Sequence, residues 1–264
     1  MRILQLSDPH IRVPGNPLSG RVETLAYFQR AIAAVEQFRP RPDVVLVTGD
    51  IVDLMSPEEY EFARQALERL SLPTFVLPGN HDERTGMRAA LGRYLGQVLK
   101  ADCLAYPIDQ FEVRILMLDS VIPMSGQGRL GEEQLGWLES TLASQPDRPT
   151  LIALHHPPFD VGIGFMEKFG LLDRERLHAA IAPHAQVIGV VAGHIHRTIV
   201  GRVGSTVGMV APSTAHQIPL DLSPDGPETF VFEPPGFLLH EWDGNALRSH
   251  HAYLDEFGPW FRFG

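Results

Sequence analysis

The stretch Val44-Val45-Leu46-Val47-Thr48-Gly49-Asp50 is the part of the sequence that best indicates the fold. Its first four residues are apolar and mostly β-branched, a pattern that predicts a buried strand. Glycine and aspartate follow at once, so a carboxylate stands where the strand ends. In open α/β sheets, ligands gather beyond the carboxyl ends of the strands. The stretch therefore predicts an α/β fold with Asp50 at a functional edge.

Strand and helix patterns alternate on both sides of this stretch. One helix has a clear start, because Ser56 can cap it, Pro57 fits its first turn and Glu59 completes a capping box; it should end near Leu70. The other helices are expected at 25–38, 86–95, 132–142 and 173–181. Further strands are expected at 3–6, 74–77, 113–118, 151–154 and 187–192.

The pattern changes after residue 193, where helices no longer separate the strands. Strands are expected at 199–203, 205–210, 229–232, 237–242 and 246–253, with a long loop at 212–228. We therefore expect residues 1–211 to form the catalytic core. Residues 212–264 should complete the same domain with strands, a loop and an aromatic tail.

Composition excludes several classes of protein. The formal net charge of −10 argues against binding long nucleic acids, which requires a basic face. Cys103 is the only cysteine, so no intrachain disulfide can form, which fits a reducing compartment. No stretch approaches the ~20 apolar residues of a membrane span. The N-terminus reaches Asp8 too soon for a signal peptide. We expect a cytoplasmic protein without membrane contact.

Five polar motifs stand at the expected ends of strands. They are Asp8-Pro9-His10, Gly49-Asp50, Gly79-Asn80-His81-Asp82, His155-His156 and Gly193-His194-Ile195-His196. Each motif alone is more typical of an ordinary turn or a buried, hydrogen-bonded histidine. Their joint occurrence in one order, all at strand ends, favours a shared metal site instead.

The residue types indicate which metals the site would take. Mixed imidazole and carboxylate ligands suit Zn, Fe, Mn, Co or Ni and argue against a calcium site. Asp8 and His10 are two residues apart, so in an extended chain they can turn toward one ion. The carboxylate of Asp50 has two oxygens and can bridge two ions. The glycines before Asp50, Asn80 and His194 permit tight turns.

The five motifs together resemble the signature of the calcineurin-like metallophosphoesterases, D-x-H, G-D, G-N-H-D/E, H and G-H-x-H. The resemblance runs from Asp8 through His196. It implies a two-sheet β-sandwich flanked by helices, with a dinuclear metal site at one end. It also implies two groups of ligands that share Asp50: Asp8, His10, Asp50 and His196 for one ion, and Asp50, Asn80, His155 and His194 for the other.

The mechanism implied by this resemblance is hydrolysis of a phosphoester. Two divalent ions ~3.5–4 Å apart would share a bridging hydroxide that attacks phosphorus. Asn80 would help to neutralise the phosphoryl oxygens. His81 would face the substrate and stabilise that charge or protonate the leaving group, unless it only orients other residues. Asp82 would orient His81 or cap the next helix.

The motif Gly49-Asp50-Ile51-Val52-Asp53 lacks the Arg-Gly that follows it in Ser/Thr protein phosphatases, because Leu54-Met55 stands there. Arg84 could replace that arginine, although its place at a helix start favours an exposed residue. The chain is more similar to the small bacterial phosphodiesterases of the family, which act on cyclic nucleotides or glycerophosphodiesters. Within that branch, His216 would approach the substrate or serve as a structural loop histidine.

Further expectations concern the C-terminal tail, the assembly and the substrate. Trp260, Phe261 and Phe263 crowd the C-terminus and are expected to pack on the body or on a partner subunit, so we expect a homo-oligomer. The substrate is expected to be a small phosphodiester. The alternatives are a broad-specificity phosphomonoesterase or nuclease, and a metal-binding scaffold without catalysis.

Overall fold

Strand β2 (Val44–Thr48) forms where its sequence predicts it, and all of its residues are buried. It lies between two parallel neighbours, β1 (Arg2–Leu6) and β3 (Thr74–Leu77). On the other side of β1, β10 (Gly236–Trp242) pairs antiparallel with β1, and β11 (Leu247–Tyr253) forms the edge. The computed structural model describes residues 1–263. Its first sheet has the order β11-β10-β1-β2-β3.

The second sheet has the order β4-β5-β6-β7-β9-β8. Its central strands run parallel, while β4 and β8 pair antiparallel at the edges. The strands are β4 (Tyr106–Ile108), β5 (Arg114–Met117), β6 (Thr150–Ala153), β7 (Val187–Ala192), β8 (Ile199–Val203) and β9 (Thr206–Val210).

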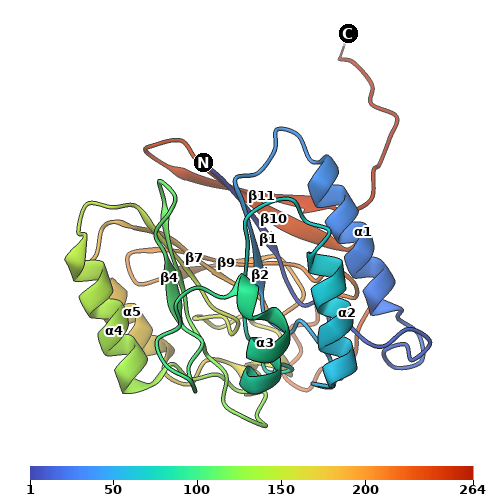
Figure 1. The fold of residues 1–264 in the computed structure, drawn as a ribbon, viewed down its shortest axis with the longest axis horizontal. Coiled ribbons are helices and arrows are strands. Elements are labelled where there is room, and N and C mark those ends of the chain that lie inside the picture. The colour runs from blue at the N-terminus through green and yellow to red at the C-terminus, as the bar shows by residue number, and fades with distance from the viewer. Residues whose placement is uncertain (264) are drawn as a thin grey trace.

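Helices cover the outer faces of both sheets (Figure 1). α1 (Thr24–Gln37), α2 (Pro57–Leu67) and α3 (Arg84–Leu91) pack on the first sheet, and α4 (Gly131–Ser144) and α5 (Arg174–Ile181) pack on the second. Two short 3-10 helices, η1 (Gly92–Tyr94) and η2 (Met166–Phe169), complete the helical elements of residues 1–263. The layers are therefore helices, sheet, sheet and helices.

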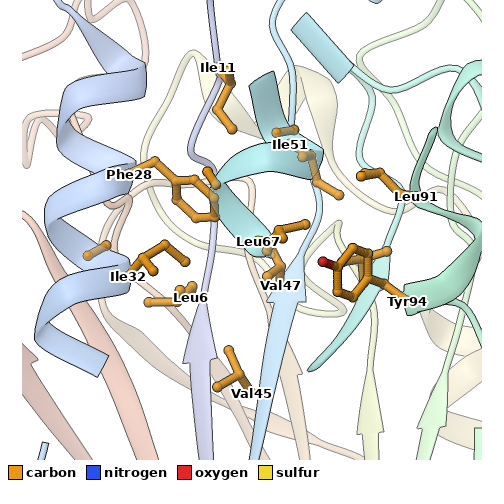
Figure 2. Packing of buried hydrophobic residues seen from close by; sticks show 14 of the residues in the cluster. Leu6, Ile11, Phe28, Ile32, Val45, Val47, Ile51, Leu67, Leu91 and Tyr94 are labelled. Atoms are coloured by element: carbon orange, nitrogen blue, oxygen red, sulfur yellow. The ribbon is translucent and has the colours of Figure 1, made fainter. Parts of the chain in front are cut away.

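The two faces of β2 explain its continuous apolar pattern. Val45 and Val47 pack with Phe28 and Ile32 of α1 (Figure 2). Val44 and Leu46 point the other way and belong to a separate cluster shared with strands of the second sheet. A strand buried on both faces needs apolar residues at every position, because successive side chains point to opposite faces.

Most of the expected elements form, with a few differences. The capping box of α2 is present, although the helix ends at Leu67. β4 was not predicted, because it is only three residues long and contains Pro107. The strand expected at 229–232 is wrong: Val231 makes a single bridge to Gln217, and Phe230 lines a cavity.

The C-terminal aromatic residues do not pack on the body of the protein. Trp260 is 94% exposed, and Phe261 and Phe263 are similarly open to solvent. Figure 1 shows the last segment leaving the sheets beyond β11. Packing on the body is therefore wrong for this tail. Within residues 1–263, no helix combines the length and the apolar character needed to cross a bilayer.

Candidate metal centre

The five predicted motifs meet where parallel strands of the two sheets end. Asp8 follows β1, Asp50 follows β2 and Asn80 lies just after β3. From the second sheet, His155 follows β6, and His194 with His196 follows β7. Hydrogen bonds join these loops across the two sheets. The backbone amide of His194 donates to both carboxylate oxygens of Asp8, at 2.9 Å to Oδ1 and 3.1 Å to Oδ2. Motifs that are distant in sequence therefore form one site.

Backbone geometry turns these side chains inward in a way that differs from our expectation. Asp8 and His10 are not extended: both have positive φ angles, 51° and 44°. Such left-handed conformations are uncommon for residues other than glycine and occur at functional sites. The same conformation occurs at three more of the predicted ligands, Asp50, His194 and His196. The convergence arises from strained turns, not from neighbouring positions on an extended face.

The first group of predicted ligands contains Asp8, His10, Asp50 and His196, whose donor atoms all lie within 4.8 Å of one another. Nε2 of His10 lies 3.0 Å from Nε2 of His196. Each of these rings uses its Nδ1 to donate outward, His10 to Asp53 and His196 to the carbonyl of His216. The two Nε2 lone pairs therefore face each other, which is favourable only if a cation lies between them.

The second group has the same character around His155. Its Nδ1 donates to the carbonyl of Thr48 at 2.9 Å. Its Nε2 lies 3.1 Å from Oδ1 of Asn80 and 3.4 Å from Oδ2 of Asp50. His194 donates from Nε2 to the carbonyl of Phe169 at 3.0 Å, which leaves its Nδ1 as the free nitrogen. Outer hydrogen bonds of this kind fix the tautomer of metal-binding histidines.

Asp50 connects the two groups. Its Oδ2 lies 3.4 Å from Nε2 of His10 and 3.4 Å from Nε2 of His155. Its Oδ1 instead accepts a hydrogen bond from the backbone amide of His81 at 2.8 Å. One carboxylate oxygen is therefore placed where it can serve both groups, and the donor set fits a pair of metal ions.

The electrostatics of the buried residues also indicate a need for positive charge. Burial raises the pKa of Asp8 to about 6. Burial acts to lower the pKa of His155, but the carboxylates of Asp50 and Asp8 outweigh it and raise that pKa to about 9. Burial together with the positive charge of His155 lowers the pKa of His194 to about 3, which keeps its imidazole neutral. Buried carboxylates are stable only when a proton or a cation compensates them.

A cavity of about 660 Å³ opens above this cluster. Its lining includes Asp50, Asn80, His81 and His216, whereas Asp8 and His155 are fully buried beneath it. The apolar part of the lining consists of Leu18, Met55, Met124, Phe165, Met166, Phe169, Ile218 and Phe230. The cavity is large enough for a small organic phosphoester and exposes only some of the predicted ligands.

His81 lies at the cavity with a side chain that is 42% exposed. Its Nδ1 donates to the backbone carbonyl of Asp53 at 2.9 Å, so Nε2 is the nitrogen left for a ligand. The Asp53 carboxylate lies between His10 and Arg12 and accepts hydrogen bonds of 3.2 and 2.8 Å from them. Sequence reasoning assigned no role to Asp53 or Arg12, although Asp53 stands only three residues after Asp50.

The structure gives Asp82 a role that we did not expect. Its carboxylate accepts from the backbone amides of Gly79 and Ile51 at 2.9 and 3.0 Å, and so ties two ligand loops together. The adjacent helix α3 is capped by Glu83 instead. Both expected roles of Asp82, orienting His81 and capping the helix, are therefore wrong.

Two other residues near the site have their polar atoms occupied. Arg84 was expected to be exposed, but it donates two hydrogen bonds to the buried Asp119, at 2.6 and 2.8 Å. It does not line the cavity above the cluster. His156 lies close to His155 and His194, but its Nδ1 contacts Ser120 Oγ at 2.8 Å and its Nε2 contacts the carbonyl of Gly126 at 3.1 Å. Neither ring nitrogen of His156 is free for a metal ion.

His216 reaches the cavity from the long loop after β9. Its ring packs 4.6 Å from the ring of His196 and 5.3 Å from that of Phe230, measured between centroids. Its Nδ1 is buried and has no hydrogen-bond partner among the described residues. Its carbonyl accepts from Nδ1 of His196, so His216 supports a predicted ligand as well as lining the cavity.

Comparison with known proteins supports the same interpretation. A family model described as calcineurin-like phosphoesterase matches residues 1–198. The probable glycerophosphodiester phosphodiesterase GpdQ of Arcobacter nitrofigilis is 35% identical over 263 residues, which cover 98% of this chain and 96% of that protein. The 3',5'-cyclic adenosine monophosphate phosphodiesterase CpdA of Pseudomonas aeruginosa is 30% identical over 81% of this chain and 76% of its own length.

Solved structures show the same fold at low identity. A dimetal phosphatase from Danio rerio superposes with a TM-score of 0.74 at 15% identity, over 97% of this chain and 96% of that chain. A purple acid phosphatase from yellow lupin seeds gives a TM-score of 0.67 at 17% identity, over 96% of this chain and 51% of that chain.

Proposed function

This chain belongs to the calcineurin-like phosphoesterase family and is a metal-dependent phosphodiesterase, and on that premise we propose that its substrates are glycerophosphodiesters. The observation that carries the chemistry is the place of Asp50 Oδ2, 3.4 Å from a histidine of each ligand group. Similarity to proteins named glycerophosphodiesterase over 98% of this chain supports the substrate class. Cyclic nucleotides are the second candidate, since a probable cyclic nucleotide phosphodiesterase of Synechococcus is 35% identical over 89% of the chain.

We assign the ligands of each ion as the family motif and the facing lone pairs suggest. One ion takes Asp8, His10, Asp50 and His196, and the other takes Asp50, Asn80, His155 and His194. Iron, manganese, zinc and cobalt all suit this mixture of nitrogen and oxygen donors. When bound, the two ions activate a water molecule and neutralise charge on the phosphoryl group.

The residues of the chain then have distinct tasks. Asn80 lines the cavity and can donate from its amide nitrogen to a phosphoryl oxygen, while its Oδ1 stays near His155. Nε2 of His81 is the ring nitrogen open to the cavity, and a proton carried there stabilises the developing charge or passes to the leaving alkoxide. His216 lines the cavity beside His196, which supports a substrate-binding role for its ring.

Hydrolysis of bis(p-nitrophenyl) phosphate tests the proposal most directly. Protein stripped with a chelator is reconstituted with Mn²⁺, Zn²⁺ or Fe²⁺, and turnover is measured before and after each addition. We expect activity to vanish on chelation and to return with metal. Turnover that does not depend on metal would contradict the proposal, and absence of turnover with every metal would favour the non-catalytic scaffold.

A substrate panel on the reconstituted enzyme then resolves the substrate class. It compares glycerophosphoethanolamine, cyclic AMP, p-nitrophenyl phosphate and single-stranded DNA. We expect the highest kcat/KM for glycerophosphoethanolamine. A higher value for cyclic AMP would favour the second candidate, and preference for the monoester or for DNA would favour the phosphomonoesterase or nuclease alternative.

We propose a homo-oligomer, supported by the exposed aromatic side chains of Phe257, Trp260, Phe261 and Phe263. We treat residues 1–211 as the catalytic core and 212–264 as its completion, because β10 pairs with β1 inside the first sheet. The single, buried Cys103 is consistent with a cytoplasmic location.

A further inference from the structure

Arg12 lines the catalytic cavity, yet the mechanism above gives it no task. It stands two residues after His10, and its side chain is 16% exposed. One terminal nitrogen, Nη1, donates to Oδ2 of Asp53 at 2.8 Å. The other oxygen of Asp53 lies 3.7 Å from Nδ1 of His81. A single carboxylate therefore separates the guanidinium from the residue proposed to face the reacting phosphoryl group.

The guanidinium of Arg12 has more donors than partners. Its Nε is buried and has no hydrogen-bond partner, and the second terminal nitrogen donates to nothing within residues 1–263. An arginine side chain offers five N–H groups in a planar fork. Nε is closed off from the cavity, whereas the second terminal nitrogen is not among the buried unpaired atoms and is the donor that a bound molecule can reach. A hydrogen bond from that nitrogen to an oxygen atom of the ligand would use the free donors of the fork.

The charge around Arg12 indicates the chemistry of that oxygen. Asp53 already compensates the guanidinium, so the pair is close to neutral and a second anionic group would be repelled by the adjacent carboxylate. A neutral hydroxyl oxygen can accept a hydrogen bond without that repulsion. Several other lining residues, among them Met55, Met124 and Phe165, are apolar and offer no such donors.

We propose that Arg12 is a specificity-determining residue that donates hydrogen bonds to the hydroxyl groups of one alcohol arm of the diester. This inference rests on the proposed phosphodiesterase function and deepens it, because it predicts preference for a hydroxylated alcohol such as a polyol. The contact lies one carboxylate away from His81, within reach of an arm attached to the phosphoryl group.

A pair of matched substrates tests the inference. Propyl p-nitrophenyl phosphate and 2,3-dihydroxypropyl p-nitrophenyl phosphate share a leaving group and a three-carbon arm, and differ only by two hydroxyls. With the metal-reconstituted enzyme, we expect the dihydroxypropyl ester to have about a tenfold higher kcat/KM. In Arg12→Met the ratio should fall close to one, mainly through a higher KM for the hydroxylated ester. Arg12→Lys should give an intermediate ratio, because lysine keeps the charge but loses the fork.

Arg21→Met is the matched control, because Arg21 is exposed on the same loop and does not line the cavity. It should leave the ratio as in the wild type. A wild-type ratio near one, or an unchanged ratio in Arg12→Met, would overturn the inference. The inference would also be overturned if Arg12→Met lost metal and lost kcat equally with both esters, because Arg12 would then only support Asp53. Hydrolysis of neither diester by the wild type would instead overturn the proposed function, and the inference with it.

Discussion

One oxygen of the Asp50 carboxylate accepts a hydrogen bond of 2.8 Å from the backbone amide of His81. This hydrogen bond turns Oδ1 away from the two ligand groups and leaves Oδ2 between them. It also couples the proposed metal bridge to the loop that carries His81. The same aspartate is therefore in a position to hold the proposed metal ions and to orient the loop whose side chain faces the cavity.

Asp50→Ala should deplete both metal ions, because the lost carboxylate serves both ligand groups. Metal content is measured by inductively coupled plasma mass spectrometry on protein whose folding is verified by circular dichroism. We expect close to no bound metal and turnover near background. Asp147→Ala, which alters an exposed carboxylate, should keep the wild-type metal content. Full retention of one ion in Asp50→Ala would show that the bridge is wrong.

His81→Ala should keep both metal ions while lowering kcat by about 100-fold or more, the range of a lost acid–base group. The reason is that His81 contributes only its backbone amide to Asp50, and alanine retains that amide. The dependence on the leaving group separates the two possible roles. A larger loss with an alkyl diester than with a p-nitrophenyl diester indicates proton donation, and equal losses indicate charge stabilisation. An unchanged kcat would exclude both.

His216→Ala should raise KM with little change in metal content. The hydrogen bond that supports His196 comes from the carbonyl of residue 216 and survives the substitution. The lost ring is the part that lines the cavity. KM and metal content are measured on the same preparation. A loss of metal without an effect on KM would assign His216 to the structural role.

Gly49→Ala should destabilise the fold and displace His155. Gly49 has a φ of +90°, and a Cβ atom there would lie 2.4 Å from Nδ1 of His155. Strain and steric overlap together predict a loss of about 2 kcal/mol or more in the free energy of unfolding, measured with urea. Gly136→Ala is the control, since Gly136 lies inside α4 with no atom near its Cβ position, and it should be slightly stabilising. Equal stability of the two variants would contradict this account.

The sequence predicted which residues meet at the site better than how they meet there. Apolar runs such as 44–47 identify buried strands, and polar residues after them identify the edge where ligands converge. The inward turn of Asp8 and His10 depends on left-handed φ angles that the pattern does not encode. The acceptors that orient the histidines are largely backbone carbonyls, as at Phe169, and these have no signature in the residue types.

Edge elements were the other limit of prediction. β4 has three residues and includes Pro107, so the strand is too short to show an alternating pattern in the sequence. The run 229–232 has the composition of a strand, but its partner is a single residue of the loop, Gln217. Tertiary contacts decide both cases, because strand propensity depends on the neighbours that a strand finds.

His240 predicts a pH dependence of stability that is separate from the metal centre. Its ring is fully buried between Gln5 and Ser249, with hydrogen-bond distances of 3.0 and 2.7 Å. Burial and, to a lesser extent, the nearby His250 lower the pKa of His240 from 6.5 to about 3. At pH values between about 3 and 6.5, the unfolded chain binds a proton at His240 and the folded chain does not. The free energy of unfolding therefore falls as the pH drops below 6.5.

His240→Gln removes this titration while keeping polar atoms near Gln5 and Ser249. Urea unfolding of metal-free wild type and variant at pH values from 7 down to 5 measures the difference, with ~1.4 kcal/mol per pH unit as the largest slope that one group contributes. The wild type should lose stability more steeply than the variant below pH 6.5. Protonation of the metal ligands affects both proteins equally and cancels in the comparison. Parallel pH profiles would contradict the prediction, because they would mean that the folded protein binds a proton at His240 as readily as the unfolded chain does.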